Sequence, residues 1–432
     1  MPTYYLWNIG CQMNKAESDQ LAECLDGVGY RRLARPDDAD LVLLNTCVVR
    51  GNAEERVRGE LSRLKGLKAL RPGMSVAVTG CFVGGGLEEL RERFPHVDLF
   101  FPAGQVALFR DWLSERVATG CHGAGVSLSA GPAAPAAYVP IIRGCNNFCS
   151  YCIVPYRRGR EISLSPEEVV ARVQDLAGRG AREVTLLGQN VNSYGKDLLS
   201  RADLTDLLAQ VNGVPGIERI RFLTSHPRDV DEKFVDAMAR LDRVCKWISL
   251  PVQAGDDRVL QAMRRGYTVE EYRRLVKRMR ARIPGLALST DVIVGFPGET
   301  EADFGRTVAL LSELRFDTVH VAAYSVRPGT LAARTMPDDV LPEQKGRRLQ
   351  EIEEMQERIS AELNSSLVGK RVEVLVERRA KGKWEGRTRT NKLVFFSDAG
   401  EWTGRLADVE VTSASPWSLQ GKVALRTEVG AR

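Results

Sequence analysis

The amino-acid sequence predicts an α/β protein in three parts: a small N-terminal parallel α/β domain, a central partial (β/α)6 barrel and a C-terminal antiparallel β-barrel. The chain has 432 residues, which at ~150 residues per domain corresponds to about three domains. Apolar runs alternate with amphipathic helical patterns over most of its length, as in parallel α/β folds. Near the C-terminus the pattern changes to short alternating runs between Gly and Asn turns, which is typical of small β-barrels.

The N-terminal domain is expected over residues 1–116. Three apolar runs, each followed by a helical pattern, predict strands at Tyr4–Ile9, Leu41–Thr46 and Ser75–Thr79. This order predicts a parallel sheet with helices on its faces. Residues 117–137 are rich in Gly, Pro and Ala and offer little to bury, so we expect a linker there.

The central domain is expected over residues 138–363. Ser165 and Thr268 each precede a helical pattern with Glu three residues later, which predicts a capping box. Residues 342–363 predict one long charged helix that leads to the last domain. Six strand–helix units favour a partial barrel over an eight-fold one, with strands at Tyr138–Arg143, Glu183–Gln189, Arg219–Thr224, Trp247–Val252, Ala287–Val294 and Thr318–Ser325.

The C-terminal domain is expected over residues 364–432. It contains 13 Lys+Arg and 8 Asp+Glu, so the whole net charge of +5 lies in this part of the chain. Positive charge confined to one domain indicates a nucleic-acid partner. Its strands are expected at Val372–Val376, Leu393–Phe396, Val409–Thr412 and Val423–Leu425.

Composition places the protein among soluble cytoplasmic enzymes. Hydrophobic residues make up 44% and charged residues 27%, and no window holds the ~18 apolar residues of a membrane span. The first residues lack the basic and apolar regions of a secretory signal. Nine cysteines, an odd number, argue against a disulfide framework and favour metal binding or redox chemistry.

Three cysteines, Cys145, Cys149 and Cys152, lie within eight residues directly after the first strand of the central domain. Such a loop can hold three thiolates around one iron–sulfur cluster. Structural zinc sites use four ligands, and no fourth Cys or His is nearby. Three thiolates on a four-iron cluster leave one iron open to a small molecule. The alternatives are a zinc knuckle and a chance grouping.

Three further cysteines, Cys11, Cys47 and Cys81, each follow a predicted strand of the N-terminal domain. The carboxyl ends of parallel strands share one edge of a sheet, so these residues are expected to converge. Gly10 and Gly80 would let the backbone approach a bulky cluster. The alternative is three buried core residues. Packing roles are expected for the remaining cysteines, Cys24, Cys121 and Cys245.

The cysteine patterns resemble a known family. Cys-x3-Cys-x2-Cys, with Tyr151 before the last cysteine, is the pattern of radical S-adenosylmethionine enzymes. Together with the N-terminal cysteines and the basic tail, it resembles the methylthiotransferases, and among them the tRNA 2-methylthio-dimethylallyladenosine synthases. Matching stretches run along almost the whole chain: Gly10–Asn14, Asn45–Cys47, Gly80-Cys81, Tyr151–Tyr156, Leu186–Asn192, Thr224–Pro227 and Val292–Glu299.

The resemblance implies a radical mechanism with two 4Fe-4S clusters and S-adenosylmethionine. Cys145, Cys149 and Cys152 would hold the cluster that cleaves S-adenosylmethionine to a 5′-deoxyadenosyl radical. Cys11, Cys47 and Cys81 would hold an auxiliary cluster whose sulfur is methylated by a first S-adenosylmethionine. The radical would take hydrogen from carbon 2 of a prenylated adenosine at position 37, in the tRNA anticodon stem-loop. Breaking an unactivated C–H bond requires a radical, and a reactive radical requires an enclosed, dry site.

Cofactor contacts are expected from Tyr151, Gly188, Gln189, Gly295 and Gly298, most of which lie at strand ends on the barrel rim. The glycines are equally compatible with ordinary turns. His226 at another strand end could touch cofactor or RNA, or be a satisfied rim histidine. The sequence departs from the family pattern at Arg143, Ala254 and Asp256, none of which is an expected ligand.

The tail resembles a TRAM domain, a small RNA-binding barrel. Phosphate neutralisation would give salt-dependent affinity, and Trp384 is expected to stack on a base. The alternative is a solvated charged hairpin. The seven positive charges of this segment fall within 15 residues, at Arg378, Arg379, Lys381, Lys383, Arg387, Arg389 and Lys392.

Three other functions compete with this interpretation. A relative with the same clusters modifies an aspartate of a ribosomal protein, but Gln12-Met13-Asn14 and Thr224–Pro227 favour the tRNA branch. Another thiolates a differently modified adenosine, against which Gly188–Asn192 argues. The third is an RNA-binding protein with structural zinc, which iron and sulfide analysis would separate. We expect a monomer with no membrane partner, supplied by separate electron and sulfur donors.

Overall fold

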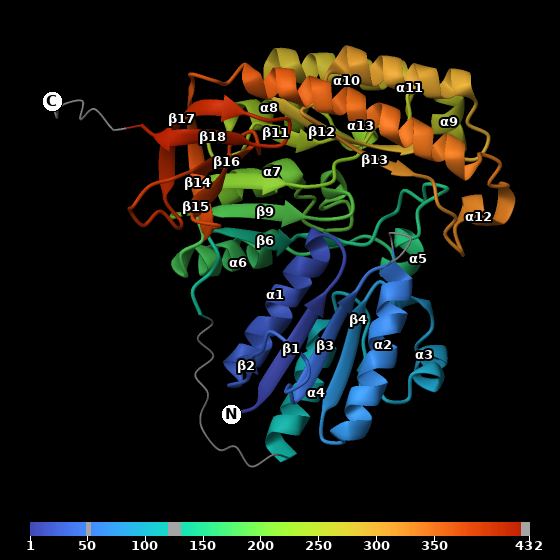
Figure 1. Ribbon diagram of the computed structural model, residues 1–432, viewed down its shortest axis with the longest axis vertical. Helices are drawn as coiled ribbons and strands as arrows, with labels where there is room; N and C mark the ends of the chain where they lie inside the picture. The colour runs from blue at the N-terminus through green and yellow to red at the C-terminus, as the bar shows by residue number, and fades with distance from the viewer. Residues whose placement is uncertain (49–52, 120–130, 425–432) are drawn as a thin grey trace.

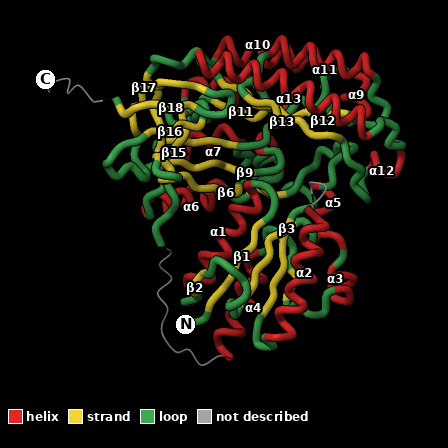
Figure 2. Tube along the Cα trace, viewed as in Figure 1, coloured by secondary structure: helices red, strands yellow, loops and turns green. Residues whose placement is uncertain are grey.

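The computed structural model describes residues 1–48, 53–119 and 131–424. Cys121, most of the expected linker and Leu425 lie outside these ranges. The N-terminal domain lies below the central barrel, and the tail barrel lies at one end of it (Figure 1). Helices cover both faces of the N-terminal sheet and the outer face of the central barrel (Figure 2). No helix of the described ranges is long and apolar enough to cross a membrane.

The N-terminal domain is a five-stranded parallel sheet in the order β2-β1-β3-β4-β5. Both faces of β3 and β4 are buried because helices cover the sheet on each side. The predicted strands are confirmed, and the edge strands β2 and β5 were too short to predict. The bounds are β1 (Thr3–Asn8), α1 (Gln12–Gly27), β2 (Arg31–Arg32), β3 (Leu41–Thr46), α2 (Ala53–Leu70), β4 (Ser75–Gly80), α3 (Leu87–Arg93), β5 (Leu99–Phe100) and α4 (Val106–Thr119).

The central domain is a partial barrel of six parallel strands, as predicted. Two three-stranded sheets, β6-β9-β10 and β11-β12-β13, meet at a parallel bridge between Ile220 and Val244. The strands are β6 (Ala136–Pro140), β9 (Glu183–Leu187), β10 (Arg219–Phe222), β11 (Trp247–Ser249), β12 (Ala287–Val294) and β13 (Thr318–Ala323). A small antiparallel pair, β7 (Ile142–Arg143) and β8 (Ile162–Ser163), flanks the cysteine loop.

Three helices of the central domain, α6, α10 and α13, begin where the sequence predicts. Ser165 and Thr268 form the two expected capping boxes. Helix α13 runs along the outer side of the barrel toward the tail (Figure 1). The bounds are α5 (Val154–Arg158), α6 (Pro166–Gly178), α7 (Leu204–Asn212), α8 (Glu232–Arg240), α9 (Asp257–Ala262), α10 (Val269–Arg282), α11 (Glu301–Leu314), α12 (Leu331–Thr335) and α13 (Pro342–Ser365).

The tail is a closed five-stranded barrel in the order β14-β15-β16-β18-β17. Its neighbouring strands are antiparallel except β16 and β18, which pair in parallel, so the expectation of a fully antiparallel barrel is corrected at that pair. The charged segment that was not expected to be a strand contains β15. The bounds are β14 (Arg371–Ala380), β15 (Lys383–Thr388), β16 (Leu393–Phe396), β17 (Leu406–Ala414) and β18 (Leu419–Val423).

Candidate functional site

The thiols of Cys145, Cys149 and Cys152 share one site in the loop between β7 and α5. Cys149 is buried, and the other two are partly exposed. Burial raises the pKa of Cys152 to about 12, and the neighbouring Cys149 and Cys145 thiols add to the shift. Burial also raises the pKa of Cys145 to about 11. We call these three residues the central triad.

The loop of the central triad is fixed from both sides. Gln189, just after β9, accepts a hydrogen bond from the amide of Gly144 (2.6 Å). Gly144 has φ +77°, and a Cβ there would overlap the carbonyl oxygen of Arg160, so only glycine fits. On the other side, the amide of Ser150 donates to Met263 O (3.1 Å) and its hydroxyl to Ala262 O (2.7 Å).

The structure also brings Cys11, Cys47 and Cys81 together, at the carboxyl edge of the N-terminal sheet. A Cβ placed on Gly10 would lie 2.8 Å from Cβ of Cys47. The amide of Cys81 donates to Thr46 O, next to Cys47 (3.0 Å). Burial raises the pKa of Cys81 to about 11, and the nearby Cys47 and Cys11 thiols raise it further. We call these residues the N-terminal triad.

Two asparagines join the loops of Cys11 and Cys47 in the N-terminal triad. Asn14 donates to Thr46 O (2.8 Å) and to Asn45 Oδ1 (3.1 Å). Asn45 donates in return to Asn14 O (2.8 Å). Gly80 has φ +98°, and a Cβ there would overlap the backbone of Thr46. The close approach of β3 and β4 at this point therefore requires glycine at position 80.

Each triad has a buried arginine that the sequence did not single out. Arg158 donates from Nε to Sγ of Cys81 (3.2 Å), and Arg265 donates from Nη1 to Sγ of Cys149 (3.4 Å). Each belongs to an Arg-Arg pair, Arg157-Arg158 and Arg264-Arg265, in which sequence alone does not tell which member is buried. Both guanidinium groups offset the negative charge that thiolates would bring into these sites.

The donor atoms around each triad fit an iron–sulfur cluster better than a zinc ion. Among the described residues, no three His, Cys, Asp or Glu side chains converge as ligands of a single metal ion. A four-iron cluster instead takes one thiolate on each of several iron atoms, so its ligands surround a larger body. Each triad supplies sulfur only, with an arginine at hydrogen-bonding distance from one thiol. Three thiols also leave one iron of such a cluster without a protein ligand.

Four of the buried polar atoms without hydrogen-bond partners among the described residues lie after β9 and β10, at Asn190, Asn192, Ser225 and His226. His226 is 5% exposed, and its Nδ1 accepts from the amide of Arg228 (3.2 Å), which leaves Nε2 unpaired. Burial, helped by Arg265, lowers the pKa of His226 to about 3. The imidazole is therefore neutral, and this rim offers a small polar molecule several free partners.

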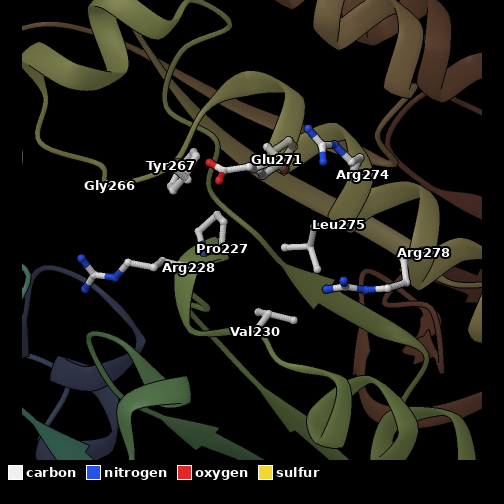
Figure 3. Close-up of a pocket in the computed structure, with 10 residues that line it drawn as sticks. Pro227, Arg228, Val230, Gly266, Tyr267, Glu271, Arg274, Leu275 and Arg278 are labelled. Atoms are coloured by element: carbon white, nitrogen blue, oxygen red, sulfur yellow. The ribbon is translucent and has the colours of Figure 1, made fainter.

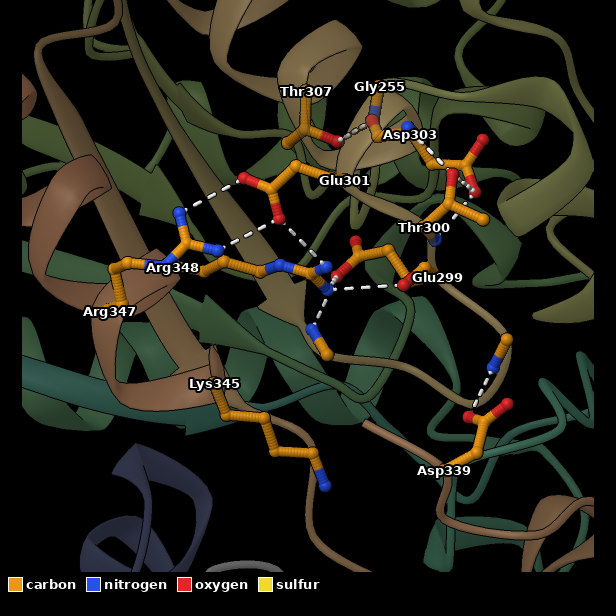
Figure 4. Close-up of polar contacts among 12 residues, drawn as sticks. Gly255, Glu299, Thr300, Glu301, Asp303, Thr307, Asp339, Lys345, Arg347 and Arg348 are labelled. Carbon is orange, nitrogen blue, oxygen red and sulfur yellow. Dashed lines mark hydrogen bonds and ion pairs between the residues drawn. The ribbon is translucent and has the colours of Figure 1, made fainter. Parts of the chain in front are cut away.

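The glycines expected to meet the cofactor have structural roles on this rim. Gly188 lets the end of β9 pack against Ile142, whose side chain a Cβ would overlap. A Cβ on Gly295 would overlap Lys345. The amide of Gly298 donates to Asp339 (2.7 Å), and Glu299 forms a buried ion pair with Arg348 (2.8 Å; Figure 4). Contact of these glycines, or of Tyr151, with S-adenosylmethionine stays a prediction.

A cavity of about 870 Å³ connects the tail barrel with the two sheets of the central domain and with helix α1 of the N-terminal domain. Its wall includes Gln12, next to Cys11, and Thr224, at the end of β10. Thr224 has φ +67°, and Gln253, which follows β11, has φ +74°. Left-handed backbone at non-glycine residues is costly; it occurs in turns and recurs at functional sites. The far end of the cavity is lined by Arg387, Lys392 and Trp417 of the tail, among other residues.

Known proteins match the whole chain. Residues 3–102 match the Uncharacterized protein family UPF0004, residues 139–311 the Radical SAM superfamily and residues 365–424 the TRAM domain. The tRNA-2-methylthio-N(6)-dimethylallyladenosine synthase of Dehalococcoides mccartyi is 49% identical over 98% of this chain and 99% of its own. The protein of the same name from Roseiflexus sp. is 48% identical over 99% and 91% of the two chains.

The chain belongs to the tRNA-2-methylthio-N(6)-dimethylallyladenosine synthase family. Solved structures agree in fold. The radical S-adenosylmethionine methyltransferase TsrM of Kitasatospora setae, with cobalamin and a [4Fe-4S] cluster bound, has a TM-score of 0.54 at 18% identity over 77% of each chain. The cobalamin-dependent radical enzyme OxsB has a TM-score of 0.53 at 14% identity over 82% of this chain and 56% of its own.

The tail of this synthase-family member corrects one expectation. Trp384 is 2% exposed, and its Nε1 donates to Asp398 O (3.1 Å). Its position on β15 points it into the barrel core beside Phe396, so the ring is not free to stack on a base. The aromatic side chain that is open is Trp417, which is 63% exposed and lines the cavity.

The seven charges predicted to bind RNA divide into three groups. Arg389 and Lys392 reach the central domain: Arg389 donates to Val244 O (3.2 Å), and Lys392 pairs with Asp317 (2.9 Å). Arg387 donates within its own turn to Asn391 O (3.2 Å). The four others, Arg378, Arg379, Lys381 and Lys383, are exposed. Sequence reasoning could not separate charges that join domains from charges that face solvent.

Two arginines of β10 anchor the tail to the barrel. Arg219, which is fully buried, donates to Arg387 O (2.6 Å) and pairs with Glu373 (2.8 Å). Arg221 donates to Thr388 O (2.6 Å) and pairs with Glu183 inside the barrel (2.7 Å). The tail barrel is therefore joined to the central domain through buried, charge-assisted hydrogen bonds.

The three departures from the family pattern have local roles. Asp256 caps α9 by accepting from the amide of Val259 (3.1 Å) and pairs with Arg306 (2.7 Å). Ala254 is buried in the small core beside Phe296. Arg143 donates weakly to Gly104 O in the N-terminal domain (3.4 Å). None of these contacts involves a thiol.

A second cavity, of about 330 Å³, lies between the segment after β10 and helix α10 (Figure 3). Pro227, Tyr267 and Leu275 are among its lining residues, and arginines stand around it. Arg228 belongs to this wall and also donates to Asn147 in the loop of the central triad (2.5 Å). No cysteine is among the residues that line it.

Proposed function

We propose that this protein transfers a methylthio group to carbon 2 of a prenylated adenosine at position 37 of tRNA, with S-adenosylmethionine as methyl donor and radical source. The observation that carries the proposal is the single cavity that runs from the tail barrel to the residue next to Cys11 and to the end of β10. No cysteine is among the residues that line this cavity, but a nucleotide held by the tail would be brought through it toward Gln12, next to the N-terminal triad. The membership of the chain in the synthase family supports the same reaction.

The cysteines would hold two 4Fe-4S clusters, one on each triad. When bound, the clusters and S-adenosylmethionine supply an electron, a carbon-centred radical, a methyl group and a sulfur atom. The chain itself positions and encloses these groups. Gln189 holds the loop of the central triad, and Asn14 holds the loops of Cys11 and Cys47 together. The radical step would require that water be kept from the space between the triads.

The tail would bind the anticodon stem-loop. Arg379, near the end of β14, and Lys381, in the turn between β14 and β15, are exposed and can neutralise phosphates. Trp417 at the cavity wall can stack on a base, which is worth ~1–3 kcal/mol in single-strand binders. The proposal places the protein in the cytoplasm as a monomer that receives electrons and sulfur from separate donors.

The test uses protein purified and reconstituted without oxygen. About eight irons and eight acid-labile sulfides per chain are expected for two four-iron clusters. With a prenylated tRNA deuterated at carbon 2 of the target adenosine, deuterium should appear in 5′-deoxyadenosine, and nucleoside mass spectrometry should show one methylthio group. Zinc without sulfide, or a product that keeps its deuterium, would reject the proposal.

A further inference from the structure

Arg158 joins the segment that follows the central triad to the N-terminal triad through a buried set of contacts. It is the last residue of α5, the helix that begins two residues after Cys152. Its side chain is 4% exposed. Nε donates to Sγ of Cys81 (3.2 Å), Nη1 to Glu17 (2.7 Å) and Nη2 to Asn14 Oδ1 (2.8 Å). One planar guanidinium therefore binds a candidate cluster ligand and two residues of α1.

The partners of Arg158 extend to the rest of the N-terminal triad. Asn14 Oδ1 also lies 3.5 Å from the thiol of Cys11, and Asn14 Nδ2 donates to Thr46 O, next to Cys47. A substitution of Arg158 should therefore disturb the hydrogen bonds around all three cysteines of this triad. None of these contacts is made by the central triad, although Arg158 belongs to the same segment as Cys152.

The junction around Arg158 is tightly packed. A Cβ on Gly84, three residues after Cys81, would overlap the carbonyl oxygen of Arg157. The Glu17 carboxylate is 7% exposed, and its Oε2 has no hydrogen-bond partner among the described residues. Glu17 therefore depends on Arg158 for compensation of its buried charge. The Arg158–Glu17 ion pair is neutral overall as long as the Cys81 thiol carries no negative charge.

We propose that Arg158 is the positioning residue of the auxiliary cluster: it fixes Cys81 and Asn14 against the segment of the central triad and sets the cluster's reduction potential through its hydrogen bond to Sγ of Cys81. The inference rests on the proposed function, because it requires a cluster on the N-terminal triad. A charged donor at a ligand sulfur stabilises the reduced cluster, whose negative charge is larger, and so raises the potential.

The first experiment isolates the auxiliary cluster. In a Cys145→Ala, Cys149→Ala, Cys152→Ala background, only the N-terminal triad can be loaded, and its potential is read by an EPR-monitored redox titration. Arg158→Gln should shift the potential to a more negative value and weaken cluster retention against a chelator by roughly 10- to 100-fold. Arg157→Gln, which removes the same charge from the neighbouring position, should change neither quantity.

The direction in which the reduction potential shifts in a second variant, Glu17→Gln, separates this role from a merely structural one. Glu17→Gln leaves Arg158 beside Cys81 without its counter-charge, so the potential should become more positive. Arg158→Lys keeps a charge but cannot reach three partners at once, so the potential should recover in part and cluster retention should not. Equal shifts in the same direction for Arg158→Gln and Glu17→Gln would indicate loosening of the site and overturn the proposal.

The last readout uses the chain with all its cysteines. Arg158→Gln should cleave S-adenosylmethionine at the wild-type rate but form at least tenfold less methylthiolated tRNA for each 5′-deoxyadenosine. A folded Arg158→Gln protein with unchanged potential and unchanged ratio rejects the inference alone. Absence of iron from the triple-alanine protein with Arg158 intact would instead reject the auxiliary cluster, and with it that part of the proposed function.

Discussion

The two cysteine triads are built in opposite ways. The central triad comes from one loop of eight residues. The backbone of this loop is held by individual hydrogen bonds, such as the one from the amide of Gly144 to the side chain of Gln189. The N-terminal triad comes from three loops, each at the end of a different strand, and is held by the register of the sheet and by Asn14 and Asn45. A site of the first kind is encoded locally, whereas a site of the second kind exists only once the domain has folded.

The largest effect is expected at the central triad. Cys149→Ala should abolish cleavage of S-adenosylmethionine and with it every later step, because the cluster would lose one of its three thiolates. The assay is 5′-deoxyadenosine formation with dithionite as reductant. Residual cleavage above one-hundredth of the wild-type rate would contradict the assignment of this thiol.

The N-terminal triad should separate the two halves of the reaction. Cys47→Ala is expected to spare cleavage of S-adenosylmethionine and to remove the methylthiolated nucleoside, since the lost ligand belongs to the sulfur-bearing site. Cys24→Ala, in α1 of the same domain, is the matched control and should behave as wild type. If Cys47→Ala still produced methylthiolated tRNA, the auxiliary assignment would be wrong.

Glycine substitutions test how each triad is supported. Gly80→Ala should destabilise the N-terminal domain by about 1–3 kcal/mol, because the new Cβ meets the backbone of Thr46. It should also lower iron retention at that triad only. Gly73→Ala has open space around it and serves as the control. Gly144→Ala should instead lower iron retention at the central triad and leave the N-terminal triad unchanged. Denaturant unfolding and iron analysis measure both.

The tail offers a smaller effect, on binding rather than chemistry. Trp417→Ala should weaken tRNA binding by ~1–3 kcal/mol, the range for loss of one stacked base, and Trp417→Phe should restore most of it. Filter binding at fixed ionic strength measures the change. Full affinity in Trp417→Ala would remove this residue from the RNA-binding surface.

The smallest effect concerns pH. Because the pKa of His226 is lowered to about 3 in the folded chain, the unfolded chain binds more protons between pH 6.5 and pH 3. Stability should therefore fall as the pH drops through this window, by at most about 2 kcal/mol from this group at pH 5. Urea unfolding of the cluster-free protein at pH 7 and pH 5 should show a smaller loss for His226→Gln than for wild type.

Much of the fold could be predicted because its elements are long and strongly patterned. Strands such as Leu41–Thr46 and Ala287–Val294 were placed with their observed bounds, and capping boxes at Ser165 and Thr268 fixed two helix starts. The two-residue strands β2 and β5 have too few residues to show a period. Strand β15 was hidden because its exposed charges dominate its sequence, while its inward residues, such as Trp384, form the barrel core.

The candidate site also contains residues that the sequence could predict and residues that it could not. The cysteine positions follow from spacing and from strand ends, both of which are visible in the sequence. The arginines that contact the thiols, Arg158 and Arg265, could not be found, because their partners are distant in sequence and the burial of one arginine in a pair depends on tertiary packing. The role of Trp384 was wrong for the same reason: an aromatic residue among charges does not reveal which face of a strand it occupies.

Anchoring of the tail by Arg219 and Arg221 has a consequence for the choice of substrate. Because these buried contacts hold the tail barrel at one end of the cavity, the distance from the tail to the thiol triads is set by the protein scaffold. Under the proposed function, a target base would be selected by its distance along the RNA strand from the phosphates bound at the tail as well as by its prenyl group.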